Sequence, residues 1–178
     1  TTTLQVSADN KAPRLIATSS LDGRTIGVCY DERATPQTIG DNFNYIVNGG
    51  AGSVLLAEAR PDGRTAILYL ETPITGTFTV QADNIEDPAG NTLGGGLASG
   101  IVQGFLPLDV GGPTVLGSSF SCVPGEIDVF AGGADIWGAS DQGHLTLTPR
   151  YGDFDIHAQV QSLTRVDARS GAALETLM

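Results

Sequence analysis

The chain has 178 residues, enough for one large domain or two small ones, and 40% of them are hydrophobic. It carries 20 Asp and Glu against nine Lys and Arg, which gives a formal net charge of −11. An acidic surface repels phosphate backbones and anionic lipid headgroups, so neither nucleic-acid binding nor membrane-surface binding is expected. The apolar stretches are far shorter than the roughly 20 residues of a membrane-spanning helix, so we expect no membrane insertion.

Apolar and polar residues alternate with a period of two along most of the chain, which predicts β-strands rather than helices. The clearest case is residues 25–30, where Ile26, Val28 and Tyr30 share one face and are expected to point into a core. Cys29 belongs to the other face and is expected to point away from that core. Further strands are predicted at residues 15–18, 43–47, 53–58, 64–70, 77–82 and 101–105, with 93–100 as a small, flexible connection.

The sequence Asp-Gly-Arg-Thr occurs at residues 22–25 and again at 62–65, each time leading into a predicted strand. Asp-Gly supplies the positive φ angles that tight hairpin turns require, so the repeat predicts two hairpins that are built alike. About seven short strands within about ninety residues, separated by such turns, is the pattern of an immunoglobulin-like sandwich.

A run of Pro and Gly after this region predicts a domain boundary, because these residues interrupt a β-ladder. We therefore assign residues 1–11 to a linker or the end of a preceding domain, 12–106 to an immunoglobulin-like sandwich, 107–112 to a linker, and 113–178 to a partial second sandwich. In the second part the alternation is clearest at residues 154–160. Its inward side chains are expected to be Phe154, Ile156, Ala158 and Val160.

Residues 12–105 resemble the bacterial immunoglobulin-like domains that occur in tandem in S-layer proteins and large adhesins. The resemblance is carried by Leu-Asp-Gly-Arg-Thr at 21–25, Val-Cys-Tyr-Asp-Glu at 28–32, Asn-Tyr-Ile-Val at 44–47 and Asn-Ile-Glu-Asp-Pro-Ala-Gly-Asn at 84–91. It implies a non-catalytic structural or adhesion module of a larger secreted or cell-surface bacterial protein. The alternative is a carbohydrate-binding accessory module of an extracellular multidomain protein.

Residues 132–178 resemble the beginning of a bacterial extracellular family with a concanavalin A-like sandwich, on the motifs at 133–138, 140–142 and 151–156. The resemblance covers about the first third of that family, so we expect the chain to be cut from a longer polypeptide. An incomplete sandwich leaves strand edges and an apolar face uncovered. We therefore expect a neighbouring domain of the same polypeptide, or another subunit, to complete it.

Oxygen-bearing side chains gather in one predicted loop: Asp83, Glu86, Asp87 and Asn91. Carboxylate and amide oxygens are the ligands that Ca²⁺ prefers, and calcium is the one cofactor that the sequence indicates. The alternative is a hydrogen-bonded turn in which Asp87 accepts backbone N–H groups and Gly90 takes a positive φ.

A possible glycan site is formed by Trp137, the single Trp of the chain, with Asp135 and Asp141. An exposed Trp ring can stack on a sugar, although such a residue also serves as a core or rim anchor.

Catalysis has little support in the sequence. Asp153 and Asp155 could flank a glycosidic bond, but the Glu-x-Asp-x-x-Glu pattern of glucanases is absent. His144 and His157 are the histidines available as bases, and no Gly-x-Ser-x-Gly elbow accompanies them. We therefore predict that the chain is not an enzyme.

The chain has two cysteines, Cys29 and Cys122, which fall in different predicted domains. Two residues this far apart do not define a disulfide framework. Two free thiols and one interdomain disulfide both remain open.

Overall fold

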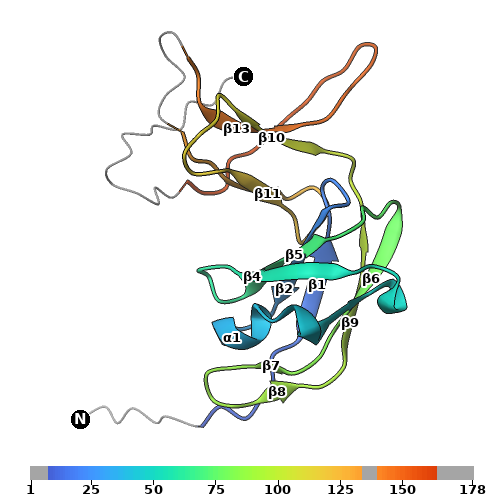
Figure 1. Cartoon of the computed structure of the whole chain (residues 1–178), viewed down its shortest axis with the longest axis vertical. Coiled ribbons are helices and arrows are strands. Elements are labelled where there is room, and N and C mark those ends of the chain that lie inside the picture. Colours follow the sequence, from blue (N-terminus) through green and yellow to red (C-terminus); the bar gives the residue numbers. More distant parts are fainter. Residues whose placement is uncertain (1–7, 134–139, 164–178) are drawn as a thin grey trace, which may run out of the picture. The chain divides into compact units, whose positions relative to one another are not determined.

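A computed structural model describes residues 8–133 and 140–163 of the chain (Figure 1). These residues form antiparallel strands joined by turns and by three short helical segments: α1 (Pro36–Ile39), η1 (Asn42–Asn44) and η2 (Asn48–Gly50), of which the last two are 3₁₀ turns. The predicted all-β fold class is confirmed. None of the described helices is long and apolar enough to cross a membrane.

The chain divides into two compact units. The first holds the described residues up to Gly104 and then, after an interruption, Phe120–Asp128. The second holds Phe105–Ser119 and the described residues from Val129 onward. A small sheet of β11 (Ser118–Phe120) and β12 (Asp128–Phe130) contains the residues at which the chain passes between them. This interleaved arrangement differs from the two consecutive domains expected from the sequence.

The first unit is a sandwich of two antiparallel sheets. One sheet has the order β1 (Leu15–Ser19), β2 (Thr25–Tyr30), β5 (Thr65–Leu70) and β4 (Val54–Ala59). The other has the order β3 (Tyr45–Val47), β6 (Thr77–Ala82) and β9 (Gly96–Ile101). Both sheets contribute to one buried core, which includes Ile26, Val28, Tyr30, Ala66, Leu68, Tyr45, Val47, Phe78, Val80 and Ala82. The strands thus direct alternate side chains into the core between the two sheets, as sheet-on-sheet packing requires.

The predicted phase of β2 is confirmed. Ile26, Val28 and Tyr30 are at most 2% exposed and lie in the core, whereas Cys29 lies half-buried on the other face. The Tyr30 hydroxyl donates to the Tyr45 hydroxyl (3.0 Å) across the core. Burial raises the pKa of both phenols, so this polar link between the two sheets stays neutral and intact at physiological pH.

The two Asp-Gly-Arg-Thr turns are built alike, as predicted. The Asp22 carboxylate accepts from the backbone N–H groups of Arg24 and Thr25, and the Asp62 carboxylate accepts from the corresponding groups of Arg64 and Thr65, at 2.8–3.0 Å. The glycine of each turn takes a positive φ, +76° in the first and +68° in the second. Each turn joins two strands of the same sheet, β1 to β2 and β4 to β5.

The last strand of the sandwich differs from the prediction. It is β9, whereas the sequence predicted a flexible connection at 93–100 and a strand at 101–105. Gly96 and Gly100 belong to this strand because they pair with Ala82 and Phe78 of β6, and glycine is needed there because a side chain does not fit. A Cβ at Gly96 would crowd Leu15, and one at Gly100 would overlap Phe78 and the backbone of Thr18. Glycine here permits close packing and does not end the strand.

The loop predicted to bind calcium lies between two short paired strands of two residues each, β7 (Ile85–Glu86) and β8 (Thr92–Leu93). It lies at the end of the first unit where the described N-terminal residues run (Figure 1). Ile85 is fully buried and anchors this ribbon to the core.

The second unit contains a ribbon of β10 (Leu106–Val110) and β13 (Gly143–Leu147), paired antiparallel. Residues 107–110 of the predicted linker therefore lie in a strand. Pro107 is accommodated because β10 pairs with β13 alone among the described strands and so is an edge strand.

The predicted strand at 154–160 is not formed. Its residues pair with no described strand, and every residue from 149 to 163 is exposed. The inward orientation predicted for Phe154, Ile156, Ala158 and Val160 is therefore wrong for this structure. An alternating segment becomes a strand only when a neighbouring edge satisfies its backbone, and no described edge does so here.

Candidate functional site

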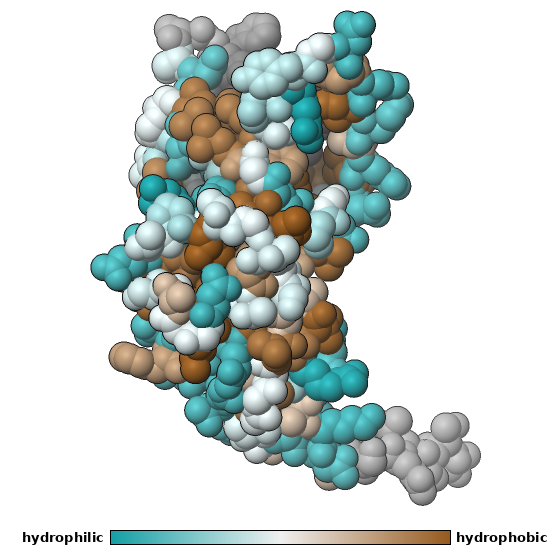
Figure 2. Space-filling model, turned by 90° about the vertical axis from the view of Figure 1, so that its right-hand side faces the viewer, coloured by the Kyte–Doolittle hydropathy of each residue, from teal (hydrophilic) through white to brown (hydrophobic). Residues whose placement is uncertain are grey.

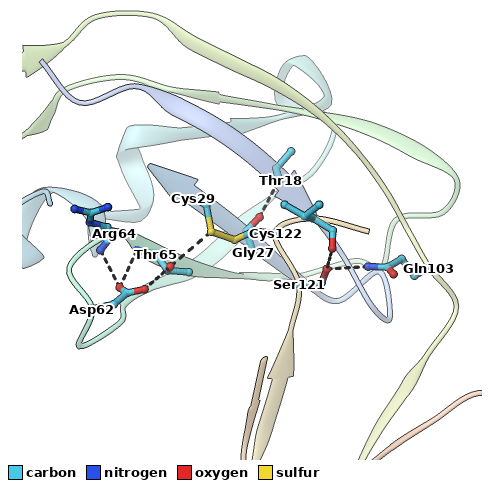
Figure 3. Close-up of a disulfide and its surroundings, with 10 residues drawn as sticks. Thr18, Gly27, Cys29, Asp62, Arg64, Thr65, Gln103, Ser121 and Cys122 are labelled. Carbon is cyan, nitrogen blue, oxygen red and sulfur yellow. Dashed lines mark hydrogen bonds between the residues drawn. A yellow bond between two sulfur atoms is a disulfide. The ribbon is translucent and has the colours of Figure 1, made fainter. Parts of the chain in front are cut away.

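The two cysteines form a disulfide, with their Cα atoms 5.9 Å apart (Figure 3). Free thiols are therefore ruled out, and the bond is also not an interdomain bridge of the expected kind. Cys122 belongs to Phe120–Asp128, which is part of the same compact unit as Cys29. The bond consequently fastens a returning segment of the chain onto the outer face of β2.

Gly27 is the reason why the returning segment can lie flat against that face. A Cβ at Gly27 would overlap the carbonyl of Ser121 and crowd the backbone nitrogen of Cys122. Ile67 pairs with Gly27 from β5 and is 1% exposed although it lies outside the main core, as expected for a covered outer face. A glycine inside a strand marks this close backbone approach.

Gln103 holds the same segment from the side (Figure 3). Its Nε2 donates to Ser19 Oγ and to Ser121 Oγ, each at 3.0 Å. Its Oε1 accepts from the backbone N–H of Gly125 (3.2 Å). One amide thus links β1 to two points of the segment that the disulfide fastens.

Asp87, one of the predicted calcium ligands, is 1% exposed and organises its own turn. Its Oδ1 accepts from the backbone N–H groups of Ala89 and Asn91, and its Oδ2 accepts from Asn91 Nδ2, all at 2.8 Å. The Asn91 side chain, with these backbone donors, lowers the pKa of Asp87. Gly90 has a φ of +89°, so the predicted hydrogen-bonded turn is present.

The acidic side chains that converge in the described structure are Asp9, Glu32 and Asp87, whose carboxylate oxygens lie within 4.8 Å of one another. Burial raises the pKa of Glu32, and the carboxylates of Asp9 and Asp87 raise it further. Sequence analysis missed Asp9 and Glu32 because they are distant from Asp87 in the chain. The structure alone places them side by side.

The predicted calcium ligands do not converge as a set. Asp83 Oδ2 accepts from Gln81 Nε2 (2.8 Å), Glu86 is exposed, and most of the acceptor capacity of Asp87 is taken up by N–H donors. Calcium binding by Asp83, Glu86, Asp87 and Asn91 stays a prediction. A calcium titration followed by thermal melting tests it.

Replacing Asp87 with alanine is expected to lower the Tm at pH 7 by several degrees, because three hydrogen bonds of the turn are lost. A lowered pKa means that the ionised carboxylate stabilises the fold above its ordinary pKa of about 3.9 and stops doing so as the pH falls through the lower folded value. The Tm difference from wild type should therefore be constant from pH 7 to about 5 and shrink below about pH 4.

The matched control is Asp9→Ala, which removes a carboxylate from the same cluster and no hydrogen bond of the turn. Its Tm should be unchanged or higher, because repulsion with Glu32 is relieved. Equal losses for the two variants, or a gap for Asp87→Ala that does not begin to shrink as the pH falls below about 4, would contradict the assignment.

The predicted glycan residues Asp135 and Trp137 lie outside the described residues, whereas Asp141 is exposed. Glycan binding therefore stays a prediction. Asp153 and Asp155 are exposed as well, and the nearest partner of Asp155 is His157, whose Nε2 lies 3.2 Å from Oδ2.

In the second unit, the structure brings together three residues that the sequence analysis did not connect. His144 Nδ1 lies 2.9 Å from Asp109 Oδ1, and His144 Nε2 lies 2.9 Å from Ser119 Oγ. A carboxylate can only accept, so Nδ1 carries the proton and, in the neutral ring, Nε2 accepts from Ser119. The hydrogen bond from His144, with one from the Gly117 backbone, lowers the pKa of Asp109.

This order of groups is that of a Ser-His-Asp triad, but the surroundings suit a structural network. Ser119 is 3% exposed and also bonds to Thr146 Oγ1, so its hydroxyl is not presented to a substrate. Gly117 packs directly on the imidazole, where a Cβ would overlap the ring. The network therefore joins β10, β11 and β13 through polar side chains.

Asp109→Ala should destabilise the second unit by about 1–3 kcal/mol, because it leaves the Nδ1–H of His144 and the N–H of Gly117 without an acceptor. Amide hydrogen exchange at Gly117 should accelerate accordingly. The matched control is Asp141→Ala, an exposed aspartate of the same unit, for which no change is expected. Covalent labelling of Ser119 by a fluorophosphonate would contradict the structural role.

No protein-family model and no curated protein matches this chain. Among solved structures it is similar to the bacterial S-layer protein SbsC. The match to the crystal structure of rSbsC(31–844) covers 74% of this chain and 22% of the SbsC chain, with a TM-score of 0.50 and 14% sequence identity. The crystal structure of the N-terminal part of SbsC gives the same TM-score and identity and is covered over 37% of its length. This chain thus spans well under half of those proteins, and the likeness is one of fold.

Proposed function

We propose that this chain is a non-catalytic structural module of a bacterial cell-surface protein. The observation that carries the proposal is the likeness of fold to an S-layer protein over 74% of the chain. Such a module functions through its rigid fold, which spaces and orients the neighbouring domains of the same protein. The sandwich core, the disulfide and the Gln103 contacts all serve rigidity, in agreement with that role.

Two further observations support this proposal. Structural disulfides form and persist in oxidising surroundings, so the Cys29–Cys122 bond favours an extracellular location. The strand order β1-β2-β5-β4 opposite β3-β6-β9 corresponds to strands A-B-E-D opposite C-F-G of a seven-stranded immunoglobulin domain. We therefore assign the first unit to the immunoglobulin-like class. The concanavalin A-like assignment of the second part stays a prediction.

Surface exposure is tested on intact cells of the bacterium that makes this protein. Antibodies raised against the chain should label those cells, and brief trypsin treatment should release peptides of the chain for mass spectrometry. A cytoplasmic marker protein serves as the control for lysis. Labelling that requires permeabilised cells would overturn the proposal.

A further inference from the structure

The ribbon of the second unit has its apolar side turned outward. Leu106 lies opposite Leu147, and Leu108 lies opposite Leu145. These four side chains, which we call the leucine face, are 42–58% exposed. The opposite face of the same ribbon carries Asp109, which bonds to His144, and the two polar residues that bond to Ser119, His144 and Thr146. The polar face of the ribbon is therefore packed against other residues, whereas its apolar face is exposed to solvent.

The second unit has little core of its own. Among its described residues the buried ones are Pro113 and Ser119, and none is a large hydrophobic residue. A two-stranded ribbon gains stability when an apolar face is covered by further structure. Figure 2 shows exposed apolar residues, drawn in brown, among the polar residues of the face in view. A contiguous apolar face on a β-ribbon marks an interaction surface.

The chain also contains an unpaired segment that matches this face. Residues 154–160 alternate between apolar and polar side chains and form no ladder with described residues. Phe154, Ile156 and Val160 are 58–65% exposed. Such a segment has an oily side and a full set of backbone hydrogen-bonding groups ready for another edge.

The receiving edge is β13. Among the described residues, this strand pairs with β10 on one side and with nothing on the other. An antiparallel alignment that sets Phe154 beside Leu147 also sets Ile156 beside Leu145. Both apolar residues of the added strand then fall on the leucine face, because side chains alternate with the same period in both strands.

We infer that residues 154–160 of one copy of this chain add as a strand to the β13 edge of a second copy and extend its leucine face. The donor segment follows β13 after a short loop and still does not pair with it within the chain, so the edge is left for another molecule. Within the described residues, every copy carries both the unpaired β13 edge and the unpaired segment. A second copy of the chain therefore supplies a strand that matches the β13 edge. This homotypic contact goes beyond the proposed function, which does not require it.

Sedimentation velocity of the full chain over a wide concentration range tests the contact. Wild type should associate as concentration rises. Ile156→Glu places a charge on the leucine face and should weaken association roughly 100-fold. Ala158→Pro removes a backbone donor from a segment that is unpaired in the monomer, so the variant should fold normally and associate less.

The matched control is Phe43→Glu, which removes an 89% exposed aromatic residue from the first unit and should leave association unchanged. A chain that stays monomeric at every concentration overturns the inference. Association that survives both changes in the donor segment overturns it as well.

Cross-linking distinguishes a second copy from the same copy. Chains carrying Leu145→Cys and chains carrying Ile156→Cys are mixed and oxidised; the native cysteines are already bonded to each other. A covalent heterodimer supports the inference, with Phe43→Cys chains in place of Ile156→Cys chains as the control for random collision. A cross-link that forms only inside a doubly substituted chain shows that the segment folds back on its own β13 and overturns it.

Discussion

Replacing both Cys29 and Cys122 with serine is expected to lower the free energy of unfolding of the first unit by about 4 kcal/mol. The disulfide joins residues 93 apart in sequence, so it removes a large amount of loop entropy from the unfolded chain. In the folded state it also fastens Phe120–Asp128 onto the sheet, together with the contacts from Gln103 and the Arg60 guanidinium over the Phe120 ring.

Denaturant unfolding of the purified chain, with and without reductant, measures this loss. Reduced wild type should match the double variant, and the variant should not respond to reductant. Thiol titration of the unfolded, unreduced wild-type chain should find no free thiol. Two reactive thiols in that titration would contradict the prediction.

The parts of the fold that follow from local sequence were predictable. The alternation in β2 fixed which side chains enter the core, and Asp22 and Asp62 fixed two turns through hydrogen bonds within three residues of themselves. Each of these features depends on neighbours in the chain, so reading the chain in order is sufficient to find it.

The glycines of β9 are an example of a feature that local sequence patterns do not predict. Gly96 and Gly100 have the composition of a loop, yet both pair with β6 in a strand. Leu93 and Leu15 occupy the space of a side chain at Gly96, and Phe78 occupies it at Gly100. The reason for a glycine in such a strand is a neighbour from another part of the chain. Composition alone does not contain that neighbour.

The candidate sites depend on such distant neighbours throughout. Cys122 reaches Cys29 because the chain leaves the first unit and returns to it, which no pattern in the sequence announced. Ser119 meets His144 only through the placement of β11 beside the ribbon. The one available signal was Gly27, a glycine in the middle of an otherwise strong strand, which indicates that another backbone passes close by.

Gly27→Ala should therefore destabilise the first unit by about 2–3 kcal/mol, although alanine is the better strand residue. Its Cβ would overlap the carbonyl of Ser121, and the segment would have to lift from the sheet. Gly94→Ala is the matched control, since nothing lies within 4 Å of a Cβ there, and its stability should be close to that of wild type.

The same substitution in the chain without cysteines gives the decisive comparison. Once the disulfide is absent, Phe120–Asp128 is held less tightly, and Gly27→Ala should then cost little or even stabilise by up to about 1 kcal/mol through the lower entropy of the unfolded chain. The two changes act on one segment, so their effects on the free energy of unfolding should fall well short of additive. Full additivity would mean that Gly27 and the disulfide act independently, and that the returning segment is not held against β2 by the bond.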